Sequence, residues 1–319
     1  MLCTPLCTIL FCLEMVLVFD AHYDLLTILY CCYLRNDFTY VERLQSDLGD
    51  VHSLIANLYF MNKDEMRDEL QIEDINVVEM FKISTALFKK YFNGKKVLFS
   101  IEGCDYIKDE VELEQLYNLG LRNILLVWNN ENKFGSGNRS DKGLTVLGEK
   151  LIRKAVKLGI SLDLSHMNKN TFWDTIKLLN TLKNDGYNDK VLVSHSNSYS
   201  LCSNKRNLDD LQIKAIGELS GKIGVVLYGP FINEQGIDLE RYYLEHIKHI
   251  SGIIGIDNIM IATDNMEFAT EIFGIEEGSN LFGHKNIIKS LTNMLRNYYN
   301  EEEINKIIKI NGERFIEER

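Results

Sequence analysis

Two types of segment alternate along the chain: short apolar runs rich in β-branched residues, and longer stretches with apolar residues at helical spacing. The apolar runs predict eight strands, at residues 16–22, 52–60, 96–103, 123–129, 160–166, 190–196, 222–229 and 258–264. The stretches 145–159 and 170–184 predict amphipathic helices, and in the first of them Leu147, Leu151 and Val156 fall on one stripe. Strands that alternate with helices indicate a parallel sheet, because a crossover helix joins parallel strands.

The eight strand and helix units predict an α/β fold, a closed (β/α)8 TIM barrel whose active site would lie at the C-terminal ends of the strands. No Gly-x-Gly-x-x-Gly motif follows an early strand, so an open dinucleotide-binding sheet is disfavoured. The tail 301–318 predicts one or two extra C-terminal helices packed on the outside. We expect residues 15–319 to form a single barrel domain.

The first 14 residues are apolar enough to suggest a signal peptide, but they lack a basic start and a small-residue cleavage site. A membrane-spanning helix would need about 20 apolar residues, and Glu14 interrupts the run. We interpret residues 1–14 as an N-terminal extension, with Met15 as the working start.

The net charge and the cysteine content argue against several classes of partner and of structural site. The formal net charge is -11 and no cluster of lysines and arginines is present, which argues against nucleic acid or an anionic membrane as partner. The seven cysteines are odd in number and irregularly spaced, so neither a disulfide framework nor a CxxC zinc site is indicated. A reducing compartment fits better, and we expect a cytoplasmic protein.

Histidines and carboxylates gather at the predicted C-terminal ends of the strands, where a ligand would bind. Two of them lie two positions apart after the first strand, so their side chains point the same way and could grip one metal ion. Two divalent ions need about five imidazole and carboxylate ligands, one of them bridging. The set comprises His22, Asp24, Glu102, His166 and His195 as ligands, with Asp264 left as a supporting group or a catalytic acid and base.

Each of these residues also has an ordinary structural interpretation. A His-x-Asp pair alone is typical of a capping or buried polar role, and Glu102 could simply begin a loop. His166 and His195 lie among residues that often cap helices. Their convergence on one rim favours a metal site. The remaining pair His246 and His249 is expected to face solvent on a helix.

Several segments together resemble one known family, the membrane or renal dipeptidases of the metal-dependent amidohydrolase superfamily. The serine-histidine-serine motif followed by an arginine-asparagine pair is the most specific part. The similarity runs from about Val16 to the C-terminus. The segments are DAHYD (20–24), SIEG (100–103), GISLDLSHMNKNTFWD (159–174), VLVSHSNSYSLCSNKRNLDDLQIKAI (191–216) and NGERF (311–315).

The resemblance implies a (β/α)8 barrel that holds two zinc ions per chain. By position, His22 and Asp24 would hold one zinc and Glu102 would bridge the two. His166 and His195 would hold the other. Members of the family are often dimers, so the resemblance also makes a homodimer an expected assembly.

The resemblance also assigns two residues to substrate chemistry. Arg206 matches the arginine that binds the terminal carboxylate of the dipeptide, a task suited to its planar fork of donors. A surface arginine near a helix start is the alternative for Arg206. Two cations lower the pKa of a shared water, so a bridging hydroxide would attack the peptide bond. Asp264 would take the proton of that water and return it to the leaving amine.

The chain departs from the family pattern at two places. Many relatives carry a histidine near the reacting carbonyl where this chain has Trp128, so substrate preference could differ. Relatives usually show Gly-Ser-Asp-Phe-Asp-Gly where this chain has IATDNMEF (261–268), which keeps Asp264 and changes the loop after it. Tyr228 either lines the substrate pocket or packs in the barrel.

Three functions are therefore open. The leading one is a zinc-dependent dipeptidase that hydrolyses small dipeptides, including some with a D-residue on the C-terminal side. The second is a binuclear metal hydrolase acting on another amide, a lactone or an ester. The third is a degenerate barrel that binds peptide or metal without turnover, and the retained Asp264 and five ligands argue against it.

Overall fold

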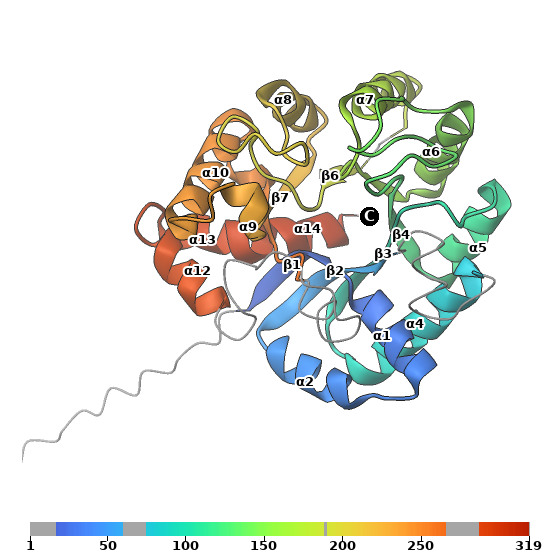
Figure 1. Ribbon diagram of the computed structural model, residues 1–319, viewed down its shortest axis with the longest axis horizontal. Helices are drawn as coiled ribbons and strands as arrows, with labels where there is room; N and C mark the ends of the chain where they lie inside the picture. The colour runs from blue at the N-terminus through green and yellow to red at the C-terminus, as the bar shows by residue number, and fades with distance from the viewer. Residues whose placement is uncertain (1–16, 60–74, 188–189, 266–286, 319) are drawn as a thin grey trace, which may run out of the picture.

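The strands of the barrel form one parallel sheet in which neighbours in sequence are neighbours in space. The computed structural model describes residues 17–59, 75–187, 190–265 and 287–318, and the predicted extension 1–14 lies outside these ranges. The α/β fold with a (β/α)8 barrel is confirmed (Figure 1). The strands are β1 (Val18–Tyr23), β2 (Val51–Tyr59), β3 (Lys96–Glu102), β4 (Leu121–Leu125), β5 (Ser161–Asp163), β6 (Val191–Val193), β7 (Lys222–Val226) and β8 (Ile259–Ala262).

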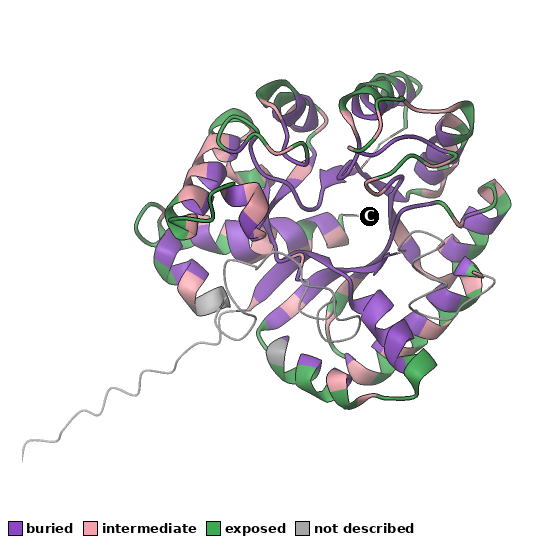
Figure 2. Ribbon diagram, in the orientation of Figure 1, coloured by how far each residue is buried: buried purple, intermediate pink, exposed green. Residues whose placement is uncertain are grey.

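Helices surround the strands and turn their apolar sides inward, as Figure 2 shows by the burial of each ribbon. Both predicted amphipathic helices are present as α6 and α7, and each begins at a side-chain cap, Thr145 and Asn168. None of the helices within the described ranges is long and apolar enough to cross a bilayer. The helices are α1 (Leu25–Arg35), α2 (Thr39–Asp47), α4 (Val77–Tyr91), α5 (Glu110–Leu119), α6 (Val146–Leu158), α7 (Lys169–Asn184), α8 (Asp210–Glu218), α9 (Gly229–Ile232), α10 (Leu239–Ile254), η1 (Ile256–Asn258), α12 (Ile287–Leu295), α13 (Glu301–Asn305), η3 (Lys306–Ile310) and α14 (Asn311–Glu317).

The C-terminal helices exist as predicted, but α14 does not pack on the outside. It crosses the N-terminal end of the barrel, where Phe315 joins the apolar cluster inside the strands with Phe19 and Leu98. Gly312 lies against the Phe19 ring so closely that a Cβ there would fall 2.0 Å from a ring carbon. An apolar plug therefore closes this end, which leaves the opposite end of the barrel for a site.

The barrel closes between its last and first strands without a ladder among the residues that the structure describes. The link is made instead by the backbone amide of Asp264, which donates to the His22 carbonyl oxygen at 3.1 Å. This bond holds the segment after β8 beside β1, at the C-terminal rim.

Candidate metal centre

The six predicted metal and acid residues all lie at the C-terminal rim of the barrel. Five of them are almost fully buried, and the side chain of Asp264 is 16% exposed. His166 and Asp264 have positive φ angles of 66° and 45°, a conformation that costs free energy for residues with a side chain and persists where the surroundings hold it. Such backbone commonly occurs at functional sites.

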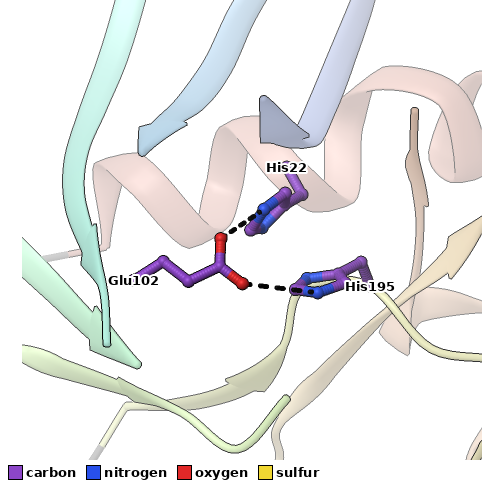
Figure 3. Close-up of side chains that lie close together, drawn as sticks. All are labelled: His22, Glu102 and His195. Carbon is purple, nitrogen blue, oxygen red and sulfur yellow. Dashed lines mark ion pairs between the residues drawn. The ribbon is translucent and has the colours of Figure 1, made fainter. Parts of the chain in front are cut away.

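Glu102 lies between histidines on two sides. Its Oε2 is 3.0 Å from His22 Nε2, and its Oε1 is 2.9 Å from His166 Nε2 and 3.9 Å from His195 Nε2. Figure 3 shows the carboxylate with one oxygen toward His22 and the other toward His195. One carboxylate thus contacts imidazoles from β1 and from the segments that follow β5 and β6.

The remaining carboxylates approach the same nitrogen of His22. Asp24 Oδ1 lies 3.7 Å and Asp264 Oδ1 lies 3.9 Å from His22 Nε2. Two groups of potential ligand atoms therefore share His22, one with Glu102 and His195 and one with Asp24 and Asp264. Within each group the atoms lie within 4.8 Å of one another, close enough to surround a cation.

Burial and charge act in opposite directions on these groups. Burial alone would lower the pKa of His22, but the carboxylates of Glu102, Asp24 and Asp264 raise it to about 10. Burial would raise the pKa of Glu102, and the charge of His22 with hydrogen bonds from His22 and His166 lowers it well below its usual value. The carboxylates favour the protonated, positively charged form of His22, and a bound divalent cation would supply that positive charge instead.

The other two imidazoles are neutral. Burial lowers the pKa of His166 to about 3 and that of His195 well below its usual value. Their Nε2 atoms lie 2.8 Å apart and both face the centre. Neutral imidazole nitrogens beside carboxylates are the donor set that zinc prefers, so the residues present fit a zinc centre.

Each of the three imidazole rings, those of His22, His166 and His195, has a polar side chain next to its Nδ1 atom, on the side away from the proposed metal. His166 Nδ1 lies 2.9 Å from Asn129 Oδ1, and Ser194 Oγ lies near Nδ1 of both His195 and His22. Metal-binding histidines usually donate their second N–H to such an acceptor. Sequence analysis missed these partners. The available signals were the first serine of the SHS motif and the asparagines after Trp128.

Arg206 lies in the loop between β6 and α8 and is buried, not on the surface. Its Nε and Nη2 atoms have no hydrogen-bond partner within the described part of the chain, and its guanidinium carbon lies 5.4 Å from the centre of the Phe231 ring. Burial lowers its pKa to about 10, so it is still charged near neutral pH. A buried cation with free donors suits an anionic group of a ligand.

A cavity of about 300 Å³ lies beside these residues. His166 and Arg206 line it from the metal side, and Met167, Tyr199 and Lys205 are among its other walls. The cavity is thus lined both by one candidate metal ligand, His166, and by Arg206. A small ligand could contact both at once.

The two predicted pocket residues lie at the rim in different surroundings. The Trp128 ring lies 6.0 Å from the His166 ring and 5.2 Å from the Tyr59 ring, measured between centroids. Tyr228 packs on the apolar cluster inside the barrel and lies 4.8 Å from the ring of Phe231. Trp128 therefore lies beside His166, a candidate metal ligand. Tyr228 packs against the Phe231 ring, which in turn lies near the Arg206 guanidinium.

The prediction that His246 faces solvent is wrong. His246 is fully buried in α10, where its Nδ1 accepts from the Ser198 amide at 3.1 Å and its Nε2 lies 2.9 Å from the Ile232 carbonyl oxygen. It ties α10 to the loop that carries Arg206. His249, one turn along, is partly exposed and pairs with Asp210 at 2.8 Å.

Two curated proteins are similar to this chain in sequence. The chain is 32% identical over 165 residues to an uncharacterized protein in the pqqA 5' region of Klebsiella pneumoniae, a match that covers 48% of this chain and 58% of that protein. It is 28% identical over 201 residues to an uncharacterized dipeptidase of Schizosaccharomyces pombe, covering 60% of this chain and 46% of that one. The chain spans about half the length of the curated relatives it matches.

A solved structure supports the fold. A metallo peptidase from Rhodobacter sphaeroides, liganded with a phosphinate mimic of the dipeptide L-Ala-D-Ala, superposes with a TM-score of 0.75 at 20% identity. The match covers 95% of this chain and 99% of that chain. A sequence model of the membrane dipeptidase family, peptidase family M19, matches residues 64–319. This chain therefore belongs to the membrane dipeptidase family.

Proposed function

We propose that this chain is a zinc-dependent dipeptidase that hydrolyses the peptide bond of small dipeptides. The observation that carries the proposal is the position of Glu102, whose two oxygens contact imidazole nitrogens on opposite sides. A carboxylate shared in this way suits two divalent cations that lie side by side. The family membership supports the same reaction class.

In the proposed centre, His22 and Asp24 would hold one zinc, His166 and His195 would hold the other, and Glu102 would be shared between the two. Two bound zinc ions would lower the pKa of a shared water and polarise the scissile carbonyl. The chain keeps the ligands buried and the imidazoles of His166 and His195 neutral, which favours metal over proton at their nitrogens.

Asp264 moves the proton in this proposal. Its carboxylate lies 3.9 Å from His22 Nε2, and burial raises its pKa. It therefore takes up a proton more readily than an exposed aspartate does. We assign to Asp264 the acceptance of the proton of the attacking water and its delivery to the leaving amine.

Arg206 selects the substrate. Its free Nε and Nη2 donors suit the carboxylate at the end of a dipeptide, and a longer peptide would lack that carboxylate near the cut. The cavity beside it would hold the C-terminal residue. The bacterial structure with its mimic of L-Ala-D-Ala suggests that a D-residue is accepted there. Trp128 would border the opposite side, beside His166.

Trp128 is the reason for considering a second class of substrates. Its indole would replace a histidine that contacts the reacting carbonyl in many relatives, so the centre could act on another amide, a lactone or an ester. The presence of all five ligands and Asp264 at one rim argues against a barrel without turnover. The homodimer and the cytoplasmic location stay predictions.

The test measures zinc content per chain and hydrolysis of a panel of L,L and L,D dipeptides by the full chain. We expect about two zincs per chain and turnover that is lost in Asp264→Asn with its zinc retained. Asp257→Asn is the matched control, because Asp257 pairs with Lys306 away from the rim. Its turnover should equal that of the wild type.

Each other outcome points elsewhere. Zinc without cleavage of any dipeptide would favour the second substrate class, which lactones and esters would then test. A chain that binds no divalent metal would refute the proposal.

A further inference from the structure

We propose that the Ser194 hydroxyl is a shared hydrogen-bond acceptor that holds His22 and His195 with their Nε2 atoms ready for metal. The inference rests on the zinc centre proposed above and adds a positioning residue to it. Ser194 follows β6 directly and is fully buried. Its hydroxyl lies behind the two rings and acts through them.

One hydroxyl lies within hydrogen-bond distance of two imidazoles, one from β1 and one from the segment after β6. Ser194 Oγ is 2.8 Å from His195 Nδ1 and 3.0 Å from His22 Nδ1. The centroids of the two rings are 3.8 Å apart. A hydroxyl oxygen has two lone pairs, so it can accept an N–H from each ring. A neutral imidazole that donates from Nδ1 keeps its lone pair on Nε2, where a metal binds.

Ser165 and Asp163, on the side of Ser194 away from the two histidines, determine to which atom the Ser194 hydroxyl donates. Ser194 Oγ lies 3.4 Å from Ser165 Oγ, and Ser165 Oγ donates to Asp163 Oδ1 at 2.7 Å. An ionised carboxylate only accepts, so hydroxyls in a chain that ends on Asp163 donate toward it. Their lone pairs are then left for donors on the other side. The protons run from the imidazoles to Ser194, from Ser194 to Ser165, and from Ser165 to Asp163.

His22 has a second neighbour at the same nitrogen. The side-chain amide of Asn57 lies there with Nδ2 at 3.1 Å, and Asn57 Oδ1 has no hydrogen-bond partner among the described residues. A half-turn of this amide would present its oxygen to the Nδ1–H of His22. The proposal requires this second orientation, because the amide Nδ2 only donates and cannot face an Nδ1–H. His22 can then donate to Asn57 as well as to Ser194, so of the two histidines His195 depends more on the hydroxyl.

The backbone of Ser194 is held on both sides. Its amide donates to Asp163 Oδ1 at 3.0 Å. On the other side, a Cβ at Gly224 would lie 1.9 Å from the Ser194 carbonyl oxygen, so β7 can approach this closely only with a glycine there. A hydroxyl fixed in this way orients one ligand of each proposed zinc, which couples the two halves of the centre.

The test compares zinc affinity, measured by competition with a chelator, in the full wild-type chain and in Ser194→Ala. We expect Ser194→Ala to bind zinc about 10- to 100-fold more weakly. In proton NMR of the zinc-loaded protein, we also expect the Nδ1–H of His195 to exchange faster with water in the variant. Ser161→Ala is the matched control, because the buried Ser161 hydroxyl bonds to Asn123 and the Arg122 carbonyl. Its zinc affinity should equal that of the wild type.

Equal zinc affinity in Ser194→Ala and the wild type would overturn this inference and leave the zinc centre standing. A wild-type chain that binds no zinc would overturn the centre itself. If Ser194→Ala does not fold, Ser194→Cys replaces it, because a thiol fills the same space and is a weak acceptor. The same loss of zinc affinity is expected there, and wild-type affinity would again overturn the inference.

Discussion

The Asp20 carboxylate accepts hydrogen bonds from both the backbone amide and the hydroxyl of Thr263, at 2.9 Å and 2.5 Å. It also accepts from the His22 amide at 3.1 Å. These bonds join β1 to the segment after β8, where the barrel has no ladder, and they set Asp264 beside His22. Burial raises the pKa of Asp20 to about 6 although these hydrogen bonds act to lower it.

Removing the Thr263 hydroxyl should weaken the contact between β1 and the segment after β8. We expect Thr263→Val to lower the free energy of unfolding by about 1.5–3 kcal/mol, the usual contribution of a hydrogen bond to a charged group. Turnover should fall as well, because Asp264 is the next residue. Urea unfolding and dipeptide hydrolysis measure the two effects. The control is Thr175→Val, since the buried Thr175 hydroxyl has no hydrogen-bond partner within the described ranges and its loss should be nearly neutral.

Glu102 should be indispensable for the second metal ion. In Glu102→Gln the amide keeps the volume and loses the charge that a bridging ligand supplies, so zinc content should fall from about two to about one per chain or less. Elemental analysis after dialysis checks this. Glu112→Gln is the control, since Glu112 is also buried but bonds to the Lys108 amide away from the rim. Full zinc content in Glu102→Gln would contradict the bridging role.

Arg206 should act on substrate and leave the metal untouched. Arg206→Lys loses the forked donors, so KM for dipeptides should rise about 10- to 100-fold, equivalent to about one charged hydrogen bond. Zinc content should stay at the wild-type value. Steady-state kinetics on a dipeptide and on its C-terminal amide separate the effects, because the amide should lose little. Arg122→Lys, at the opposite end of the barrel, is the control and should leave KM unchanged. An unchanged KM in Arg206→Lys would reject carboxylate recognition by Arg206.

His246 should make the protein sensitive to acid. Burial lowers its pKa from 6.5 to about 4, so the unfolded chain binds this proton more readily than the folded chain. The stability it contributes is present above pH 6.5 and is lost as the pH falls toward 4, by up to about 3 kcal/mol. His246→Gln can keep both hydrogen bonds without titrating. Its free energy of unfolding should therefore fall less steeply over this range, and identical pH curves would contradict the assignment.

The strands and helices were accessible from sequence because their signals are local. An apolar run such as 190–196, or the spacing of Leu151 and Val156, reports which face of a segment is buried. Leu147, which the same spacing places on that stripe, is exposed at the start of α6. The barrel rule then places residues that follow parallel strands at one end. Strand order and this rule are enough to place His22, Glu102 and the other rim residues together.

Other relationships depend on which distant segments meet, and no periodicity in the sequence reports that. The tail has ordinary helical spacing, and only the packing of Phe315 against Phe19 shows that α14 closes the barrel. His246 lies on an amphipathic helix, and its burial follows from the Arg206 loop folding onto α10.

The sequence by itself therefore determined the fold class, the family resemblance and the residue types at the rim, because alternation, spacing and motif are written in consecutive residues. Only the tertiary structure determined the hydrogen bonds between Asp20 and Thr263, the contact of Ser194 with two histidines, and the Arg206 donors that have no partner among the described residues. Each of these is a distance between side chains brought together only when the barrel closes.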